Sequence, residues 1–277
     1  MSKARSSREN LKWALRLFDK SPLKQKKLKM ISEQIDDLFA DQGEGIQCLD
    51  IGSDNGVISH LLRKKGGVWF SADLTSETVS AIKSLGLERV YQIDGLKTDF
   101  NDNQFDLIVI VDFLEHIETD REFVAELVRI LKPNGRLVVN VPRPVNGLLR
   151  KLQYAIGQTD EVHGHVRPGY SHQELSDLVK GKFKLRAYKY YNRCFTVFID
   201  TMLRAAMELK KGHAKQDSSK SLEQKGVVFS ADDVAKSAKL LKLYALVYPV
   251  IKVFVMLDSL VPFLPGNILV CSLDSDV

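Results

Sequence analysis

The stretch Cys48-Leu-Asp-Ile-Gly-Ser-Asp-Asn-Gly56 joins a short apolar run to two glycines spaced four residues apart. A helical pattern follows at once, from Val57 to about Lys65. Strand, glycine turn and helix in this order are how an α/β sheet presents a nucleotide-like ligand to a helix N-terminus. Gly52 permits a sharp turn and a close backbone approach to a ligand, and Gly56 lets the helix begin close to the strand. The pattern alone is weak, because many turns contain two glycines.

An acidic residue strengthens the nucleoside interpretation. Asp73 ends the next predicted strand, 68–72, and lies 21 residues after Gly52. A carboxylate at this place can accept hydrogen bonds from both hydroxyls of a ribose. Capping of the following helix is the alternative role, although Thr75 or Ser76 could provide that cap. Glycine turn and acid together predict a ligand that contains a nucleoside.

The residue between the glycines narrows the choice of cofactor. Nicotinamide sites usually carry Gly-x-Gly-x-x-Gly after the first strand, but Asp54 stands where the middle glycine should be. A carboxylate would repel a pyrophosphate, whereas Asp54 and Asp50 would tolerate a nucleoside with a positively charged end. A pyrophosphate cofactor is therefore disfavoured.

Beyond this stretch, strand-like and helical segments alternate. The expected strands are 46–51, 68–72, 89–93, 105–111, 136–141, 182–191 and 268–273. The main expected helices are 8–19, 22–40, 56–65, 76–85, 119–131, 171–179 and 195–210, two of them opened by the capping boxes Thr119–Glu122 and Ser171–Glu174. Nearly continuous apolar strands between helices predict a Rossmann-like, doubly wound α/β fold, with a mostly parallel seven-stranded sheet covered on both faces.

Three parts are expected along the chain. Residues 1–45 form a basic helical arm, and residues 46–191 form the nucleoside-binding core. Residues 192–277 add helices, with a mobile linker over 211–228, an apolar helix and a closing strand.

Charge is concentrated at one end of the chain. The net charge is +5, but residues 1–30 hold ten Lys or Arg against Glu9 and Asp19. A basic arm can meet nucleic acid, an anionic membrane surface or only water. Aromatic residues are sparse there, limited to Trp13 and Phe18, so we expect no nucleic-acid partner.

The cysteines and the first residues indicate a compartment. Cys48, Cys194 and Cys271 are far apart and match no metal-binding spacing, which is typical of a reducing compartment. Residues 1–30 lack the continuous apolar run of a signal peptide. We therefore expect a cytoplasmic protein, peripheral on the inner membrane face if it contacts a membrane at all.

Residues 46–141 resemble class I S-adenosylmethionine-dependent methyltransferases of the methyltransferase type 11-like group. Asp50-Ile-Gly-Ser-Asp-Asn-Gly56 is similar to the first motif of that family, acid-x-Gly-x-Gly-x-Gly, and departs from it at Asp54. Asp73 matches the acid that binds ribose, and Ile93-Asp-Gly95 matches the loop acid that meets the adenine amino group. Further matching stretches are Phe105–His116 and Leu131–Leu137.

The resemblance implies an enzyme with S-adenosyl-L-methionine as its cofactor. The cofactor-binding residues that it implies are Asp50, Gly52, Ser53, Gly56, Asp73, Leu74, Asp94, Gly95 and Val111. A methyltransferase must bind donor and acceptor in line and exclude water, and a hydroxyl acceptor also needs a base or a metal.

The acceptor is expected beside the turn after the fourth strand. Asp112, Glu115 and His116 would share one face of that turn if it is helical. His116 has three interpretations: a general base, a metal ligand with Asp112, Glu115 and one of His163 or His165, or a structural histidine. We expect no bound metal, and our catalytic candidates are His116, His165 and Asp112. Arg167 and Tyr170, in the same loop as His165, are further candidates for covering the acceptor.

The apolar stretch 243–264 approaches the length of a membrane span. Lys252 and Asp258 interrupt it, and Pro249 and Pro262 would kink or end a helix, so a span is disfavoured. A helix packed on the domain remains open, as does a helix that lies on a membrane surface or covers an apolar acceptor. Residues 1–30 favour the membrane surface slightly, because anionic lipid attracts Lys and Arg.

The sequence thus predicts methyl transfer from S-adenosylmethionine to a small or lipid-linked acceptor, with oxygen as the accepting atom. One alternative is a membrane-associated binding or scaffold protein on a degenerate methyltransferase fold. A nicotinamide-dependent oxidoreductase is a weaker alternative, since Asp54 opposes it. The oligomeric state stays open.

Overall fold

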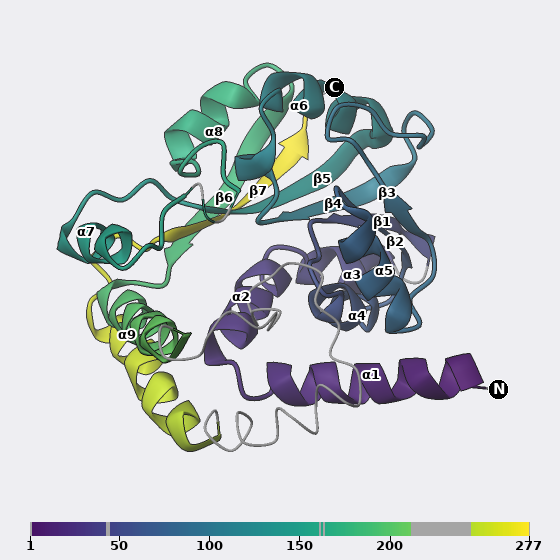
Figure 1. Ribbon diagram of the computed structural model, residues 1–277. Helices are drawn as coiled ribbons and strands as arrows, with labels where there is room; N and C mark the ends of the chain where they lie inside the picture. Colours follow the sequence, from purple (N-terminus) through teal and green to yellow (C-terminus); the bar gives the residue numbers. More distant parts are fainter. Residues whose placement is uncertain (1, 43–44, 161, 163, 212–244, 277) are drawn as a thin grey trace.

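A computed structural model describes residues 2–42, 45–160, 162, 164–211 and 245–276 (Figure 1). Its centre is one seven-stranded sheet in the order β3-β2-β1-β4-β5-β7-β6. The strands are β1 (Gln47–Ile51), β2 (Val68–Asp73), β3 (Val90–Gln92), β4 (Phe105–Val111), β5 (Leu131–Pro142), β6 (Phe183–Tyr191) and β7 (Ile268–Ser275). The first five are parallel, whereas β7 runs antiparallel to β5 and β6. The predicted Rossmann-like, mostly parallel sheet is confirmed.

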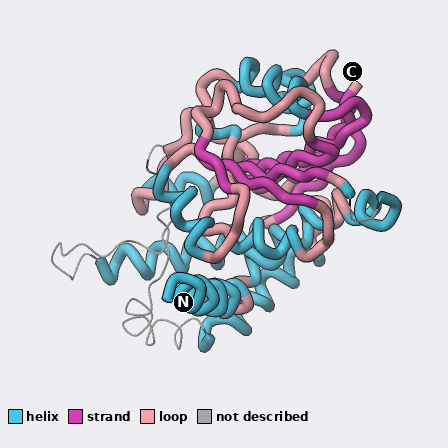
Figure 2. Tube along the Cα trace, turned by 90° about the vertical axis from the view of Figure 1, so that its right-hand side faces the viewer, coloured by secondary structure: helices cyan, strands magenta, loops and turns pink. Residues whose placement is uncertain are grey.

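Helices cover both faces of the sheet (Figures 1 and 2). One face carries α2 (Pro22–Ser32), α3 (Asp36–Gln42), α4 (Val57–Arg63) and α5 (Ser76–Ser84), with α1 (Ser2–Phe18) outside them. The other face carries α6 (Asp120–Ile130) and α8 (His172–Leu178). All residues of β1 and β4 except Gln47 and Asp106 are buried, as the continuous apolar runs predict for strands covered on both faces.

The arm differs from its prediction at one point. A single helix over 22–40 was expected, but the chain breaks between α2 and α3. Gln34 lies in this break, where its backbone oxygen accepts from Arg136 Nη1 at 3.0 Å and its Oε1 accepts from Ser272 Oγ at 3.0 Å. The amphipathic pattern shows neither bond, because both partners come from distant strands.

The two expected capping boxes have different outcomes. Ser171 and Glu174 form a complete box at the start of α8. Thr119 makes no side-chain cap at the start of α6, so that prediction was wrong. The neighbouring Asp120 accepts instead from the Tyr170 hydroxyl at 2.7 Å and pairs with Arg167, which draws the start of α6 toward another loop.

The remaining described elements flank β6 and β7. They are η2 (Leu114–His116), α7 (Leu148–Ala155), α9 (Cys194–Lys211), a helical run over 245–257 and η4 (Asp258–Leu260). The expected linker over 211–228 falls, from residue 212 onward, outside the described residues. None of the helices among the described residues has the length and apolar character needed to cross a membrane.

Candidate cofactor and acceptor site

The glycine turn sits at the carboxyl ends of β1 and β4, the part of a doubly wound sheet where ligands bind. Gly52 has a φ of 82°, and a Cβ there would lie 2.3 Å from the Val111 backbone oxygen. Gly56 has a φ of 80°, and a Cβ would meet Ile82 of α5 at 3.1 Å. Both glycines are therefore required by close packing within the protein, in addition to any approach to a ligand.

Two buried polar atoms at this turn lack hydrogen-bond partners among the described residues. Asp50 is wholly buried, and its Oδ1 accepts from Ser59 Oγ at 3.0 Å and from Ser71 Oγ at 2.9 Å. The Asp50 Oδ2 atom and the Ser53 hydroxyl receive no protein hydrogen bond in that part of the chain. Burial raises the pKa of Asp50 from its ordinary value of 3.8 to about 6. Acceptors buried in this way suit the ammonium end of S-adenosylmethionine, so the turn fits that group.

Asp54 adopts the backbone conformation that glycine usually takes. Its φ is 52°, in the left-handed region that Asp and Asn tolerate better than other side chains. Its carboxylate lies 3.8 Å from Lys24 Nζ, and both side chains are largely exposed. Asp54 therefore takes the place of the middle glycine in a left-handed backbone conformation.

The predicted ribose and adenine residues follow β2 and β3. Asp73 is buried at the end of β2, and its Oδ1 accepts from the Leu74 N–H at 2.8 Å. Asp94 is exposed after β3, and the N–H groups of Lys97 and Leu96 keep its pKa below the ordinary value. Gly95 has a φ of 79° and packs against Ile117. The carboxylates of Asp73 and Asp94 thus stand at adjacent strand ends, as the predicted cofactor site requires.

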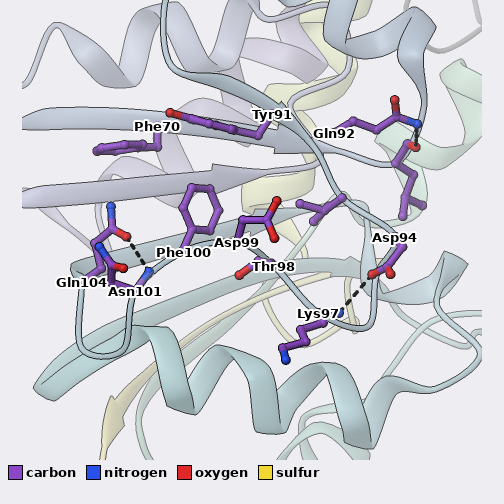
Figure 3. A pocket seen from close by; sticks show the side chains of 12 residues that line it. Phe70, Tyr91, Gln92, Asp94, Lys97, Thr98, Asp99, Phe100, Asn101 and Gln104 are labelled. Atoms are coloured by element: carbon purple, nitrogen blue, oxygen red, sulfur yellow. Dashed lines mark hydrogen bonds between the residues drawn. The ribbon is translucent and has the colours of Figure 1, made fainter.

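An open cavity of about 800 Å³ adjoins this end of the sheet (Figure 3). It shares Leu74 and Asp94 with the predicted cofactor residues, and none of the glycine-turn residues line it. Its aromatic lining comes from Phe70, Tyr91 and Phe100, which pack edge to face or stacked on one another. Flat aromatic side chains therefore lie in the same cavity as Leu74 and Asp94.

Asp112 belongs to a series of polar contacts between side chains, which begins at Lys27 on the N-terminal arm. Lys27 of α2 pairs with Asp112, and Asn140 Nδ2 donates to Asp112 Oδ1 at 2.9 Å. Tyr191 then donates its hydroxyl to Asn140 Oδ1 at 2.5 Å. Burial lowers the pKa of Lys27, but the carboxylates of Asp112, Glu115 and Asp54 outweigh burial and raise it. Asp112 is thus held as a charged partner of Lys27.

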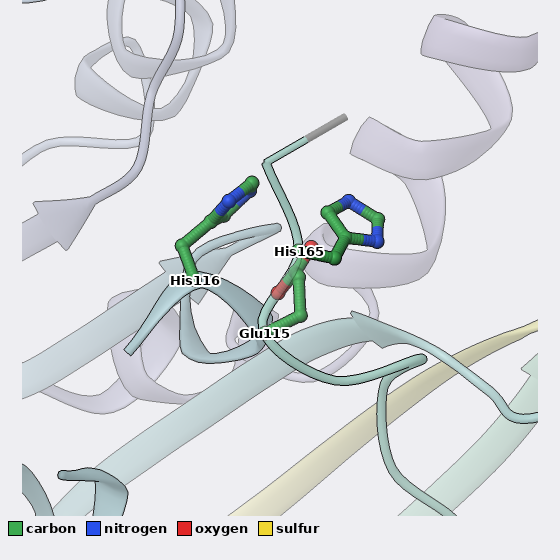
Figure 4. Close-up of side chains that lie close together, drawn as sticks. All are labelled: Glu115, His116 and His165. Atoms are coloured by element: carbon green, nitrogen blue, oxygen red, sulfur yellow. The ribbon is translucent and has the colours of Figure 1, made fainter. Parts of the chain in front are cut away.

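His116 and His165 come together beside the buried Glu115 (Figure 4). The two imidazole rings have centroids 4.9 Å apart, and ligand atoms of all three residues lie within 4.8 Å of one another. His116 Nδ1 lies 2.8 Å from the Gly164 carbonyl oxygen. A carbonyl only accepts, so Nδ1 carries the proton and Nε2 is the nitrogen that can take one.

The loop that carries His165 is fixed to the turn after β4. The Val166 N–H donates to the Glu115 carbonyl at 2.9 Å, and Arg167 Nη2 donates to the Ile117 carbonyl at 2.8 Å. Tyr170 reaches Asp120 by its hydroxyl. Arg167 and Tyr170 therefore hold the loop in place, whereas His165 faces His116.

The structure groups the predicted residues in three places. Asp50, Gly52, Ser53 and Gly56 form the glycine turn, and Asp73, Leu74, Asp94 and Gly95 follow β2 and β3. Val111, Asp112, His116 and His165 lie at or beyond the end of β4, where Asp112 belongs to the Lys27 chain rather than to the histidine cluster. His163 is outside the described residues.

Three residues of the site were missed from the sequence: Lys27, Asn140 and Tyr191. Lys27 was counted only as part of a basic arm, and Tyr191 only as part of a strand. A signal existed for Asn140, which is the one polar residue inside the apolar run 137–141. A buried amide in such a strand needs partners, and Asp112 and Tyr191 are those partners.

Comparison with known proteins agrees with this geometry. A family model described as "Methyltransferase domain" matches residues 49–139. A ubiquinone biosynthesis O-methyltransferase of Xylella fastidiosa (strain M23) is 30% identical over 118 residues, 40% of this chain and 47% of that protein. The protein of the same description from Rickettsia bellii (strain OSU 85-389) is 25% identical over 118 residues, 41% of this chain and 49% of that protein. The chain spans about half the length of these relatives.

Solved structures share the whole fold. A putative sarcosine dimethylglycine methyltransferase from Galdieria sulphuraria superposes with a TM-score of 0.57 at 14% identity, over 91% of this chain and 86% of that chain. A SAM dependent methyltransferase from Archaeoglobus fulgidus superposes with a TM-score of 0.51 at 15% identity, over 89% and 94% of the two chains. Residues 49–139 therefore match a methyltransferase domain, and the described chain has the fold that these solved structures share.

Proposed function

We propose that this protein moves a methyl group from S-adenosylmethionine to a hydroxyl oxygen of a small or lipid-linked acceptor. The observation that carries this proposal is the His116–Gly164 hydrogen bond, because it directs the basic Nε2 of His116 to act on an acceptor at the end of β4. The name of the two relatives, ubiquinone biosynthesis O-methyltransferase, supports an acceptor that is lipid-linked and accepts the methyl group on oxygen.

Each group of residues has a role in this reaction. When bound, S-adenosylmethionine supplies a methyl group on a positively charged sulfur. Asp50 and Ser53 would accept hydrogen bonds from its ammonium end, and Asp73 would accept from its ribose hydroxyls. His116 would take the proton that the acceptor hydroxyl loses as its oxygen bonds to the methyl carbon, the sulfur–methyl bond breaks and S-adenosylhomocysteine leaves. His165 and the loop that holds it exclude water from this step.

A substitution of His116 distinguishes its role as a general base from a purely structural role. His116→Asn keeps an N–H that can donate to the Gly164 carbonyl but has no nitrogen that takes a proton. We expect the rate of methyl transfer from labelled S-adenosylmethionine to a polyprenylated catechol to fall about 10²–10⁴-fold, with unchanged cofactor affinity by calorimetry. His172→Asn is the matched control, since His172 lies on α8 and contacts Tyr190. A His116→Asn enzyme with the wild-type rate would refute the base assignment.

A bound divalent metal is a second candidate, favoured by the grouping of Glu115, His116 and His165 within 4.8 Å. Imidazole and carboxylate ligands suit several divalent ions. If a chelator abolished methyl transfer and added Mg²⁺ or Zn²⁺ restored it, the acceptor would be activated by a bound metal rather than by His116 as a base. Unchanged activity after chelation would leave His116 as the base.

The cytoplasmic location of the protein stays a prediction from the cysteines.

A further inference from the structure

We propose that the helical run 245–257, together with η4 and α1, forms a surface that docks on an anionic lipid bilayer. Several large apolar side chains of this run and of the residues that follow it are exposed. They are Leu246, Val250, Val253, Met256, Leu260 and Phe263, here called the apolar face. Each of them is between 47% and 77% exposed. A spacing of three or four residues aligns Leu246, Val250, Val253 and Met256 along one side of the helix. Leu260 lies in η4 and Phe263 in the turn that follows it.

The opposite side of the same segment is fixed to the protein. Ile251 is buried, and Phe254 stacks on Phe198 of α9 with ring centroids 6.1 Å apart. Asp258 is wholly buried and accepts from the Arg193 N–H at 2.7 Å and the Thr196 hydroxyl at 2.6 Å. The segment is therefore held in one orientation, and that orientation leaves the apolar face outward.

A row of cations lies along α1, which ends beside the helical run. Arg8, Lys12 and Arg16 are exposed and spaced four residues apart, and Lys20 follows just beyond the end of the helix. Together they are called the basic stripe. The Lys20 Nζ atom lies 5.3 Å from the ring centroid of Tyr248, so the stripe ends against the helical run. Both elements lie on the side of the molecule away from α6 and α8 (Figure 1).

The combination specifies the partner by its chemistry. An apolar helix face bordered by Lys and Arg suits a surface that offers acyl chains below negatively charged headgroups. A purely apolar partner would leave the basic stripe unused, and an acidic protein alone would leave six apolar side chains in water. A bilayer that contains anionic phospholipid satisfies both parts.

The same surface lies near the acceptor end of the site. Asp160 receives the Tyr154 hydroxyl of α7 at 2.5 Å and lies 3.6 Å from His165 Nδ1. On α7, Leu148 and Leu152 are exposed, and Gln153 donates to Thr201 of α9 at 3.0 Å. The row of α7, α9 and the helical run therefore extends from the acceptor loop to the apolar face (Figure 1). Access for a lipid-linked acceptor along this row rests on the proposed function, whereas bilayer docking does not.

The test is co-sedimentation of the full chain with vesicles, without cofactor or acceptor, so its outcome is independent of methyl transfer. The vesicles are phosphatidylcholine with phosphatidylglycerol, or phosphatidylcholine alone. We expect binding to the anionic vesicles that weakens in high salt, and at least about ten-fold weaker binding to the neutral ones. Failure of the wild-type chain to bind anionic vesicles would overturn the proposal.

Two pairs of variants assign the binding to residues. Val253→Ser with Phe263→Ser should weaken binding about ten-fold or more, and Lys12→Gln with Arg16→Gln should remove most of the preference for anionic vesicles. Matched controls are Leu96→Ser with Leu185→Ser and Lys83→Gln with Lys180→Gln, exposed residues elsewhere on the molecule. Thermal unfolding checks that all variants fold.

Several results would contradict the assignment. Test variants that bind like their controls would overturn it. A wild-type dimer that the Val253→Ser, Phe263→Ser variant converts to a monomer, without vesicle binding by either protein, would assign the apolar face to a second copy of the chain. Substitutions are used because truncation before residue 268 would remove β7 from the sheet.

Discussion

Gly52 is fixed by contacts inside the protein as much as by a ligand. Its φ of 82° is costly for any other residue, and a Cβ would meet the Val111 backbone oxygen, which cannot rotate away. The end of β4 therefore approaches the turn only because no side chain stands between them. A glycine pattern in the sequence predicts the turn but does not separate these two causes.

This distinction is measurable by substitution. Gly52→Ala should lower the free energy of unfolding by about 2–4 kcal/mol, because the positive φ and the overlap with Val111 add. Gly181→Ala is a matched control, since Gly181 has a φ of 74° and nothing within 4 Å of its Cβ position. That variant should lose about 1 kcal/mol in urea unfolding. Equal losses in the two variants would mean that Val111 imposes no packing restraint.

Asp50 should make stability depend on pH. Its folded pKa of about 6 is above the ordinary 3.8, so the folded state binds the proton more tightly than the unfolded state. Its contribution is therefore present below about pH 4 and is lost as the pH rises through 6, in total on the order of 3 kcal/mol. Asp50→Asn removes the titration. In urea unfolding from pH 4 to 7, wild type should lose stability relative to this variant, and a constant difference would contradict the shifted pKa.

At the scale of the elements, an ion pair joins α2 to the sheet. Lys27 links α2 to Asp112 at the end of β4, and Asn140 and Tyr191 continue the chain across β5 and β6. Asp112 itself has a φ of 46°, so the strand end is held in an uncommon conformation. The arm is thus part of the site, and no periodicity within 1–45 could show it because the partner lies far along the chain.

Removal of the Lys27 charge should loosen this junction. Lys27→Met leaves the Asp112 carboxylate without its cation, and both side chains are mostly buried, at 21% and 31% exposure. We expect a loss of about 1–3 kcal/mol in unfolding free energy and faster amide hydrogen exchange in α2. Lys24→Met is the control, because the exposed Lys24–Asp54 pair should contribute less than about 0.5 kcal/mol. Similar losses for both variants would count against a structural role for the Lys27 pair.

At the scale of the whole molecule, local patterns predicted the sheet well. Apolar runs predicted the buried strands, among them β1, β4 and β5, since a strand buried on both faces must be apolar along its length. β6 was also predicted as a strand, although it is exposed over most of its length. The positions of Asp73 and Asp94 followed from the same strands. The break at Gln34 and the buried Asp258 could not be predicted, because each depends on partners that only the folded chain brings together. For Asn140, the sequence indicates a polar residue in a buried strand but does not identify its partners.

The catalytic candidates also differ in how well the sequence alone could predict their grouping. His116 and His165 are 49 positions apart in the sequence, and a hydrogen bond from one to the backbone beside the other unites them. Asp112 was grouped with His116 because helical spacing places them on one face. In the fold, φ at Asp112 is positive and η2 begins only at Leu114, so the spacing rule does not apply there.

The position of β7 has a consequence for the way the chain folds as it is synthesised. Among the strands that the structure describes, β6 pairs only with β7, and β7 also covers the far edge of β5. Residues 183–191 therefore leave the ribosome with no strand to join until residues 268–275 have emerged. During that interval β5 presents an open edge, which can attract other nascent chains. Folding of this domain should finish late, as the returning strand enters the sheet between two strands already made.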